Sequence, residues 1–219
     1  MFPVAEHFVS INGESTRAGE LAVFIRFRGC NLDCAYCDTK WANCAEAPAE
    51  MMSADEITAM VIDTGIKNVT LTGGEPLLQD NISELTDRLI ESGCRVEIET
   101  NGSLPICSLA LSEKRPVFTL DYKLPCSGME EFMYIDNYEF LCAEDSVKFV
   151  AETIDDLKRA SEIIKKYDLT SKCNVYFSPV FGKADIQAMV SFMIENRLNG
   201  IRLQLQLHKY IWDPQMRGV

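Results

Sequence analysis

Short strand-like segments alternate with amphipathic helices along most of this chain, and that alternation limits the folds open to it. Seven segments have the length and apolar content typical of strands: 21–27, 68–71, 95–99, 117–120, 146–150, 174–177 and 201–207. The spacing of apolar residues predicts helices at 53–64, 81–92, 153–167 and 184–196. Strands separated by helices pair in parallel through right-handed crossovers, so the sequence predicts an α/β fold.

The length of the chain favours an incomplete barrel over a complete one. A closed eight-stranded (β/α) barrel typically needs about 250 residues, and this chain has 219. We therefore expect a partial (β/α) barrel of six to seven mostly parallel strands, open on one side, with a doubly wound flat sheet as the alternative. Residues 1–219 are predicted to form one domain, in which the irregular segment 124–145 is interpreted as an insertion or a lid.

In either fold the working site lies at the carboxyl ends of the strands. Four polar segments directly follow predicted strands: the cysteine-rich loop 30–37, Gly73-Gly74-Glu75-Pro76, Thr100-Asn101-Gly102 and Asp121-Tyr122-Lys123. We expect these four loops to converge on one mouth.

The net charge and the cysteine content limit the partners and the cellular compartment that this chain can have. The chain has 21 Lys and Arg against 33 Asp and Glu, a net charge of −12, which disfavours binding to a nucleic-acid backbone. No run reaches the ~18 apolar residues of a membrane span, and residues 1–15 lack the features of a signal peptide. Nine cysteines, an odd number, are typical of a reducing compartment. We therefore expect a cytoplasmic protein without a membrane or nucleic-acid partner.

Three cysteines lie within eight residues, as Cys30, Cys34 and Cys37. A [4Fe–4S] cluster is usually held by four thiolates, so three leave one iron free for another ligand, as in open catalytic metal sites. A molecule with an amine and a carboxylate could chelate that iron. The alternative is a structural zinc site with Cys44 or His7 as the fourth ligand.

The sequence resembles the radical S-adenosylmethionine (SAM) enzymes in two motifs. Cys30, Cys34 and Cys37 match their CxxxCxxC motif, with the aromatic Tyr36 before the last cysteine, and residues 73–76 match their GGEP turn. Alone, that turn would be an ordinary tight turn before a helix. The resemblance implies a partial (β/α) barrel that holds a [4Fe–4S] cluster. It also implies reductive cleavage of SAM to a 5′-deoxyadenosyl radical, which abstracts a hydrogen atom from the substrate.

A closer resemblance, to the 7-carboxy-7-deazaguanine synthase family, runs nearly end to end. It rests on the segments Ser10–Glu14, Phe24–Leu32, Cys37-Asp38-Thr39 and Leu205–Tyr210. The family implies a ring contraction in queuosine and deazapurine biosynthesis. In that reaction 6-carboxy-5,6,7,8-tetrahydropterin becomes 7-carboxy-7-deazaguanine with loss of ammonia, SAM is recycled and Mg²⁺ is required.

The resemblance and the chemistry of the side chains together select candidate substrate ligands. A guanidinium fork such as Arg26 suits a planar carboxylate or a pterin oxygen. Glu14 could accept hydrogen bonds from the amino and ring N–H groups of the pterin. The remaining expected contacts are Ile11, Asn12, Gly13, Thr72 and His208. His208 is expected on the polar face of the last strand, with Gln204 and Gln206.

The family also implies ligands for Mg²⁺ and SAM. Thr39 resembles the family's protein ligand to Mg²⁺, whereas charge alone would favour Asp38. The expected SAM contacts are Tyr36, Cys37, Asp38, Gly74, Glu99, Asn101, Asp121, Tyr122, Lys123, Ser178, Pro179, Val180 and Phe181.

The resemblance implies two protein partners, an electron donor of the flavodoxin or ferredoxin type and a second copy of the chain in a homodimer. Two other functions are kept as alternatives. An activase for a glycyl-radical enzyme shares the compact size and both motifs, but the Asn-Gly-Glu and Cys-Asp-Thr segments argue against it. A zinc-binding interaction module is the alternative that is not an enzyme.

Overall fold

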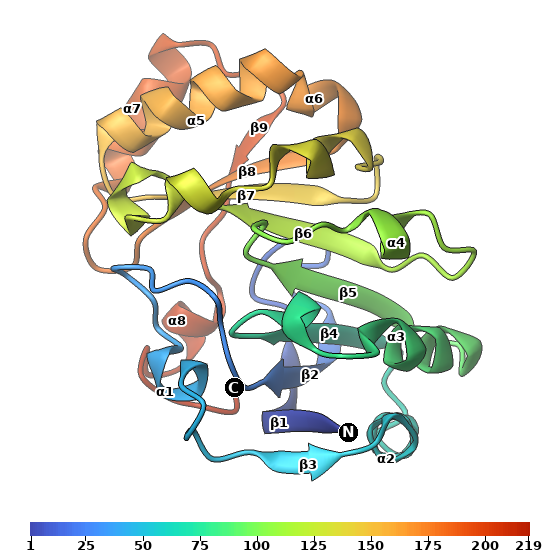
Figure 1. The fold of residues 1–219 in the computed structure, drawn as a ribbon. Helices are drawn as coiled ribbons and strands as arrows, with labels where there is room; N and C mark the ends of the chain where they lie inside the picture. Colours follow the sequence, from blue (N-terminus) through green and yellow to red (C-terminus); the bar gives the residue numbers. More distant parts are fainter.

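One curved sheet of nine strands forms the frame of the protein, and the computed structural model describes all residues from 1 to 219 (Figure 1). The strand order is β3-β1-β2-β4-β5-β6-β7-β8-β9. The strands are β1 Phe2–Ile11, β2 Leu21–Phe27, β3 Glu50–Met52, β4 Asn68–Gly73, β5 Arg95–Thr100, β6 Val117–Tyr122, β7 Ser146–Ala151, β8 Asn174–Pro179 and β9 Ile201–Leu203.

The strands from β2 to β9, β3 excepted, run parallel to their neighbours, which confirms the predicted α/β class and mostly parallel sheet. Strands β1 and β3, which were not predicted from the sequence, add to one edge of the sheet in antiparallel orientation. A register shift between Val4 and Glu6 interrupts the pairing of β1 with β2. Such an irregularity breaks the two-residue alternation by which a strand is recognised.

The last strand is shorter than predicted. The alternation over 201–207 continues past Leu203, but the chain leaves the sheet there, and the side chain of Gln204 binds Ser15 instead. His208 is the first residue of helix α8, His208–Ile211. Its predicted position on the polar face of a strand is therefore wrong.

The longer helices begin where the sequence predicts. The helices are α1 Lys40–Asn43, α2 Ala54–Asp63, α3 Ile82–Glu91, α4 Cys107–Ala110, α5 Ile154–Tyr167, α6 Leu169–Lys172, α7 Ile186–Glu195 and α8. Capping boxes open α2, with Ser53 and Glu56, and α5, with Thr153 and Asp156. None of these helices combines the length and the apolar character of a membrane span.

The two faces of the sheet differ in chemistry because side chains alternate along each strand. The outer face packs against α2, α3 and α5 (Figure 1), and four of its phenylalanines are fully buried: Phe27, Phe118, Phe149 and Phe177. Each of these rings contributes roughly 2–3 kcal/mol by leaving water. The inner face is polar and carries Thr70, Thr72, Glu97, Glu99, Thr119, Asp121, Lys148 and Ser178. A polar inner face prepares this side of the sheet for ligands rather than for packing.

The irregular segment 124–145 connects β6 to β7, where a crossover helix would otherwise lie. It contains three short 3₁₀ turns, Pro125–Ser127, Glu130–Phe132 and Ile135–Glu139. The side chain of Asn137 is fully buried, accepts from the backbone of Ile106 at 3.0 Å and donates to that of Leu104 at 2.9 Å. The segment is therefore packed onto the body of the protein.

The loop between β1 and β2 connects the two sides of the open sheet. The backbone N–H of Ser15 donates to the side-chain oxygen of Gln204 at 2.7 Å, and the Gln204 amide donates back to the Ser15 carbonyl at 2.9 Å. Leu207 N–H donates to the carbonyl of Gly13 at 3.1 Å. Residues 12–15 are thereby fixed beside the inner face.

Candidate active site

Two neighbouring chambers lie against the inner face of the sheet. The larger, here the main chamber, has a volume of about 570 Å³, and the smaller, the side chamber, about 200 Å³. They share lining residues, among them Glu14, Arg26, Thr39, Thr72 and His208. The volume of the main chamber falls in the range of small-molecule and cofactor sites.

The cysteine loop after β2 forms one wall of the main chamber. Cys30, Cys34 and Cys37 all line it. Amide groups approach two of the sulfurs: Asn101 Nδ2 lies 3.7 Å from Cys30 Sγ, and Asn43 Nδ2 lies 3.5 Å from Cys37 Sγ. Amide donors of this kind stabilise cluster-bound thiolates and tune their reduction potential.

The three thiols line one chamber, as the ligands of a cluster would. No three His, Cys, Asp or Glu side chains of the chain converge closely enough to hold a single metal ion. A cluster with several metal corners takes each thiolate on a different corner, so its ligands stand farther apart than those of one tetrahedral zinc ion. Three thiols on one loop that line one chamber suit three corners of a [4Fe–4S] cluster.

Burial disfavours the thiolate form in the cluster-free protein. It raises the pKa of Cys30 and Cys34, and the ammonium of Lys123 opposes this rise at Cys34. Bound iron would supply the positive charge that the thiolates otherwise lack.

The Gly-Gly-Glu-Pro turn is packed directly on the cysteine loop. The N–H of Gly74 donates to the carbonyl of Phe27 at 3.1 Å, and that of Glu75 donates to the carbonyl of Gly29 at 2.9 Å. A Cβ at position 74 would lie 1.9 Å from the Gly29 oxygen and 2.8 Å from the Cβ of Cys30. Glycine is therefore required at this position for the turn to meet the loop.

Glu75 holds the turn to the end of β5 and does not reach the chamber. Its carboxylate is fully buried and accepts from the Thr100 hydroxyl at 2.8 Å and the Asn101 N–H at 2.7 Å. Asn101 in turn donates to Asn31 at 3.0 Å as well as to Cys30. Asn101, an expected SAM contact, thus uses its amide N–H groups to bind the cysteine loop.

Other residues that line the main chamber supply donors and acceptors suited to a polar cofactor. Lys123 Nζ lies 2.9 Å from Asp121 Oδ2, and the other oxygen of Asp121 is buried without a hydrogen-bond partner. The hydroxyl of Tyr36 is also buried without a partner. Val180 and Phe181 supply apolar surface to the same chamber. Two unsatisfied polar atoms beside an apolar surface fit the hydroxyls and the flat base of a nucleoside.

Four expected ligands do not line either chamber. Tyr122 faces the outer core, because it alternates with Asp121 on β6, and its hydroxyl donates to Glu130 at 2.9 Å. Asn12 and Ser178 are buried and bind protein groups, Thr70 and Glu14 respectively. Pro179 is buried at the end of β8.

The substrate-side residues gather at the junction of the two chambers. Glu14 accepts from Ser178 Oγ at 3.2 Å and Gln206 Nε2 at 3.3 Å, and it pairs with Lys148 Nζ at 3.2 Å. Gly13 packs so closely on His208 that an added Cβ would lie 2.3 Å from Nδ1 of that imidazole. Burial lowers the pKa of His208, so the neutral ring is favoured near pH 7.

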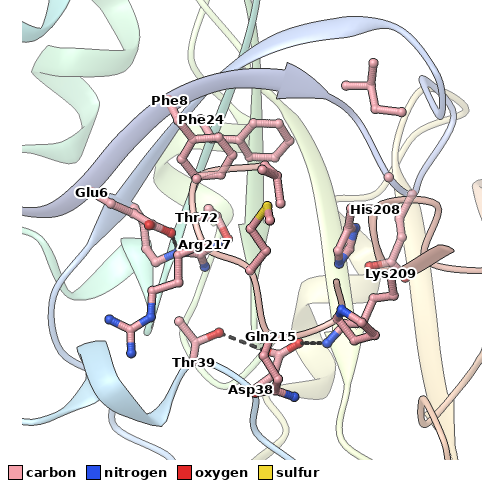
Figure 2. Close-up of a pocket in the computed structure, with 18 of the residues that line it drawn as sticks. Glu6, Phe8, Phe24, Asp38, Thr39, Thr72, His208, Lys209, Gln215 and Arg217 are labelled. Carbon is pink, nitrogen blue, oxygen red and sulfur yellow. Dashed lines mark hydrogen bonds and ion pairs between the residues drawn. The ribbon is translucent and has the colours of Figure 1, made fainter. Parts of the chain in front are cut away.

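Arg26 in the side chamber binds one partner through Nε, which leaves the two terminal guanidinium nitrogens free. Its Nε donates to Glu6 Oε1 at 2.7 Å, whereas no hydrogen bond occupies its two terminal nitrogens. Figure 2 shows Glu6 on one side of this chamber and the ring pair Phe8 and Phe24, stacked at 5.0 Å, along the wall. Arg26 is thus oriented at one nitrogen and available to a ligand at the others.

A second ion pair ties the cysteine loop to the C-terminal helix (Figure 2). Asp38 accepts from Lys209 Nζ at 2.6 Å and from the Thr39 hydroxyl at 2.9 Å. Burial opposes its ionisation, but the hydrogen bond and charge of Lys209 prevail and lower the pKa of Asp38 to about 2. Asp38 is therefore a carboxylate at neutral pH, beside the expected Mg²⁺ ligand Thr39.

Glu99 is a carboxyl group of the site whose pKa lies near neutrality. It lines both chambers and accepts from the Thr72 hydroxyl at 3.0 Å. Burial raises its pKa to about 7, against the opposing charge of Lys148. A carboxyl with such a pKa can exchange a proton at neutral pH.

Several residues of the site were not predicted from the sequence. Lys148 is the main omission, although an isolated lysine inside the apolar strand Ser146–Ala151 is itself a signal of a buried partner. Lys209 and Trp41 line the side chamber, and so do residues 214–219 of the C-terminal tail, where Arg217 lies 4.0 Å from the centre of the Trp41 ring. No periodicity or motif places the tail there.

The chain is similar in sequence to known proteins. A model of the Radical SAM superfamily matches residues 24–121, from β2 to β6. The 7-carboxy-7-deazaguanine synthase of Clostridium acetobutylicum is 52% identical over 219 residues, which cover 100% of this chain and 99% of the relative. The enzyme of the same name from Chlorobaculum tepidum is 37% identical over 219 residues, or 99% of this chain and 96% of the relative.

Solved structures support the fold. QueE from Escherichia coli superposes with a TM-score of 0.72 at 23% identity and covers 94% of this chain and 93% of its own. SuiB from Streptococcus suis, solved with S-adenosylmethionine, has a TM-score of 0.58 at 15% identity over 83% of this chain and 51% of its own.

Proposed function

The chain belongs to the radical SAM superfamily and, within it, to the 7-carboxy-7-deazaguanine synthase family, and from this membership we propose its reaction. It is a lyase that converts 6-carboxy-5,6,7,8-tetrahydropterin to 7-carboxy-7-deazaguanine with loss of ammonia, in queuosine and deazapurine biosynthesis. The observation that carries the proposal is the common chamber. Its wall holds the three cysteines, the glycine turn and four of the expected pterin contacts, which are Glu14, Arg26, Thr72 and His208.

The chamber fits the two cofactors of the superfamily. Cys30, Cys34 and Cys37 would hold the [4Fe–4S] cluster, which when bound delivers one electron for the cleavage of SAM. The side chains that face SAM in this proposal are Tyr36, Asp38, Glu99, Asp121, Lys123, Val180 and Phe181, with the backbones of Cys37 and Gly74. The unpartnered oxygens of Tyr36 and Asp121 would receive its polar groups.

The substrate would bind where the two chambers meet. The free nitrogens of Arg26 offer a fork to its carboxylate or a pterin oxygen, and Glu14 accepts from its amino and ring N–H groups. Thr72, His208, Ile11 and Gly13 complete the wall. This arrangement holds a flat, hydrogen-bonding ring against the chamber that holds SAM.

Mg²⁺ belongs to the same proposal. Thr39 lines both chambers, and its neighbour Asp38 is an oxygen donor held in its charged form by Lys209. Oxygen atoms are the ligands that Mg²⁺ prefers. An ion at Thr39 would neutralise and orient the substrate carboxylate beside Arg26.

We further propose two protein partners and a cytoplasmic location. The cysteine loop exposes Asn31, Asp33 and Ala35, so a flavodoxin or ferredoxin could approach the cluster from that side. Helix α7 exposes Val190 and Ile194, which is apolar surface that a second copy of the chain could cover. All nine cysteines are free thiols, as a reducing compartment requires.

One anaerobic assay tests the proposal. The reconstituted protein is incubated with carboxytetrahydropterin, SAM, Mg²⁺ and a reductant, and the products are identified by mass spectrometry. We expect 7-carboxy-7-deazaguanine and one equivalent of ammonia, without net consumption of SAM. A product that retains the pterin nitrogen would contradict the ring contraction. Cluster formation without pterin turnover would favour the activase, and a colourless zinc protein would favour the interaction module.

A further inference from the structure

Lys148 is the one charged residue of β7, and all six residues of that strand are buried. A buried ammonium costs free energy unless partners compensate for its lost hydration. The side chain points to the inner face and lines the main chamber, where no motif of the family includes it. Its partners therefore indicate its role.

The partners of Lys148 belong to both sides of the proposed site. Its Nζ lies 3.2 Å from Glu14 Oε2 and 3.8 Å from Asp121 Oδ2. The side chains of Lys148, Glu14 and Asp121 are 11%, 9% and 20% exposed. One ammonium thus joins a carboxylate on the pterin side to a carboxylate on the SAM side.

The Glu14 carboxylate is restrained at both oxygens. Ser178 Oγ donates to Oε1, while Gln206 Nε2 and Lys148 Nζ share Oε2. These three donors come from β8, the segment after β9, and β7. Of the three donors only Lys148 carries a charge, so its hydrogen bond to the Glu14 carboxylate is the strongest of the three.

Carboxylates from three other elements surround Lys148. They are Glu14 from the β1–β2 loop, Glu97 and Glu99 from β5, and Asp121 from β6, with Lys123 and His208 as the other titratable neighbours. Burial opposes the charge, but the carboxylates of Glu14, Asp121 and Glu99 raise the pKa of Lys148. Without this ammonium, the carboxylates would repel one another across the chamber.

We propose that Lys148 is a positioning residue whose ammonium holds the Glu14 carboxylate toward the pterin and links it to Asp121 on the cofactor side. The inference rests on the proposed function, and it adds to that function a residue that acts through Glu14.

The test compares Lys148→Met with Lys148→Arg in the cluster-containing enzyme. The pterin Kd is measured with SAM present and the cluster oxidised, so that no turnover occurs, and kcat and KM are measured under reduction. We expect Lys148→Met to raise the pterin Kd and KM at least tenfold and to lower kcat less than threefold. Lys148→Arg keeps the charge and should restore both constants to within threefold of the unaltered enzyme. Lys158→Met, on the exposed face of α5, is the control and should change neither.

A double-mutant cycle shows whether Lys148 acts through Glu14. In a Glu14→Gln background, Lys148→Met should change the pterin Kd less than threefold. An equal tenfold loss in both backgrounds would overturn the inference, because Lys148 would then contact the pterin independently. If Lys148→Met fails to fold or to bind iron, Lys148→Gln, a neutral donor, is used for the same comparison.

The outcomes separate this inference from the proposed function. If the unaltered enzyme and Lys158→Met both leave carboxytetrahydropterin unchanged, the proposed reaction is wrong. If both convert it and Lys148→Met binds it normally, the reaction stands and the positioning role of Lys148 is wrong.

Discussion

Single side chains decide whether this chain can hold its cluster. Cys34→Ala should abolish iron binding and lower turnover more than about 1000-fold, because two thiolates cannot hold the cluster in place. Iron content and the visible absorbance of the anaerobically purified variant check this. Cys44→Ala is the matched control, since Cys44 is exposed and outside both chambers. A loss of metal on removal of Cys44 would instead support the zinc alternative.

Glu99 should make the stability of the cluster-free protein dependent on pH. Its folded-state pKa of about 7 lies above the ordinary value of 4.5, so folding favours the protonated form. The penalty for ionising it is absent below pH 4.5, grows as the pH rises and is complete above 7. At about 1.4 kcal/mol per pH unit, the free energy of unfolding should fall by about 3 kcal/mol over this range.

Urea unfolding of the unaltered protein and of Glu99→Gln at pH 5 and pH 7.5 measures that contribution. The amide cannot ionise, so the variant should lose about 2–3 kcal/mol less than the unaltered protein between the two values. If the free energy of unfolding changes equally with pH in the two proteins, Glu99 is already ionised at pH 5.

Arg26 and Glu6 should contribute unequally to substrate affinity. Arg26→Ala removes the free fork and should raise the pterin Kd by about 30-fold, equivalent to roughly 2 kcal/mol. Glu6→Gln keeps a hydrogen-bond acceptor for Arg26 Nε. This substitution should therefore raise the pterin Kd by only about three- to tenfold. Iron content and SAM binding should stay unchanged in both. Normal pterin binding by Arg26→Ala, measured by equilibrium dialysis, would refute the role of the fork.

Among the connecting elements, the glycine turn after β4 has the least freedom to change. Gly74→Ala would force a methyl group into the Gly29 carbonyl, so we expect a loss of about 2–4 kcal/mol in unfolding free energy and reduced iron content. Gly128→Ala is the control, because its Cβ would meet no atom within 4 Å and only its positive φ should cost about 1 kcal/mol. Equal losses in the two variants would contradict the packing argument.

Elements that depend on local pattern were predictable from the sequence. The alternation of Val23, Ile25 and Phe27 with Phe24 and Arg26 identified β2 and its two faces, and the Ser53–Glu56 pair identified the start of α2. The strand expected at 117–120 is longer in the structure, where β6 extends to Tyr122 and the alternation with Asp121 turns the Tyr122 side chain away from the chamber. The expected contact of Tyr122 with SAM stays a prediction.

Elements that depend on distant contacts were not predictable. Strand β9 ends just before Gln204, whose side chain binds Ser15 at a distance of 189 positions in the sequence, and no local signal reveals this contact. The irregular pairing of β1 hid that strand, and the place of the tail beside Trp41 depends on the finished fold. The cysteine ligands, in contrast, lie within eight residues, so their spacing was sufficient.

At the level of the complete protein, Gln204 holds the open side of the sheet together. Gln204→Ala removes both hydrogen bonds to Ser15, so amides of residues 12–15 should exchange with solvent faster, and pterin affinity should fall about tenfold. SAM affinity should not change, because its proposed contacts lie elsewhere. Gln187→Ala, on the exposed face of α7, is the control. Unchanged amide exchange at 12–15 would show that the loop is held without Gln204.

The bond between Glu14 and Gln206 has a consequence for synthesis on the ribosome. The two residues are 192 positions apart, so Glu14 leaves the ribosome long before Gln206 does. Contacts this remote in sequence form late, after the intervening chain has closed a long loop. The cysteine loop and the glycine turn are available much earlier. The segments that would bind iron are therefore synthesised well before Gln206, which helps to hold Glu14 in place for the pterin.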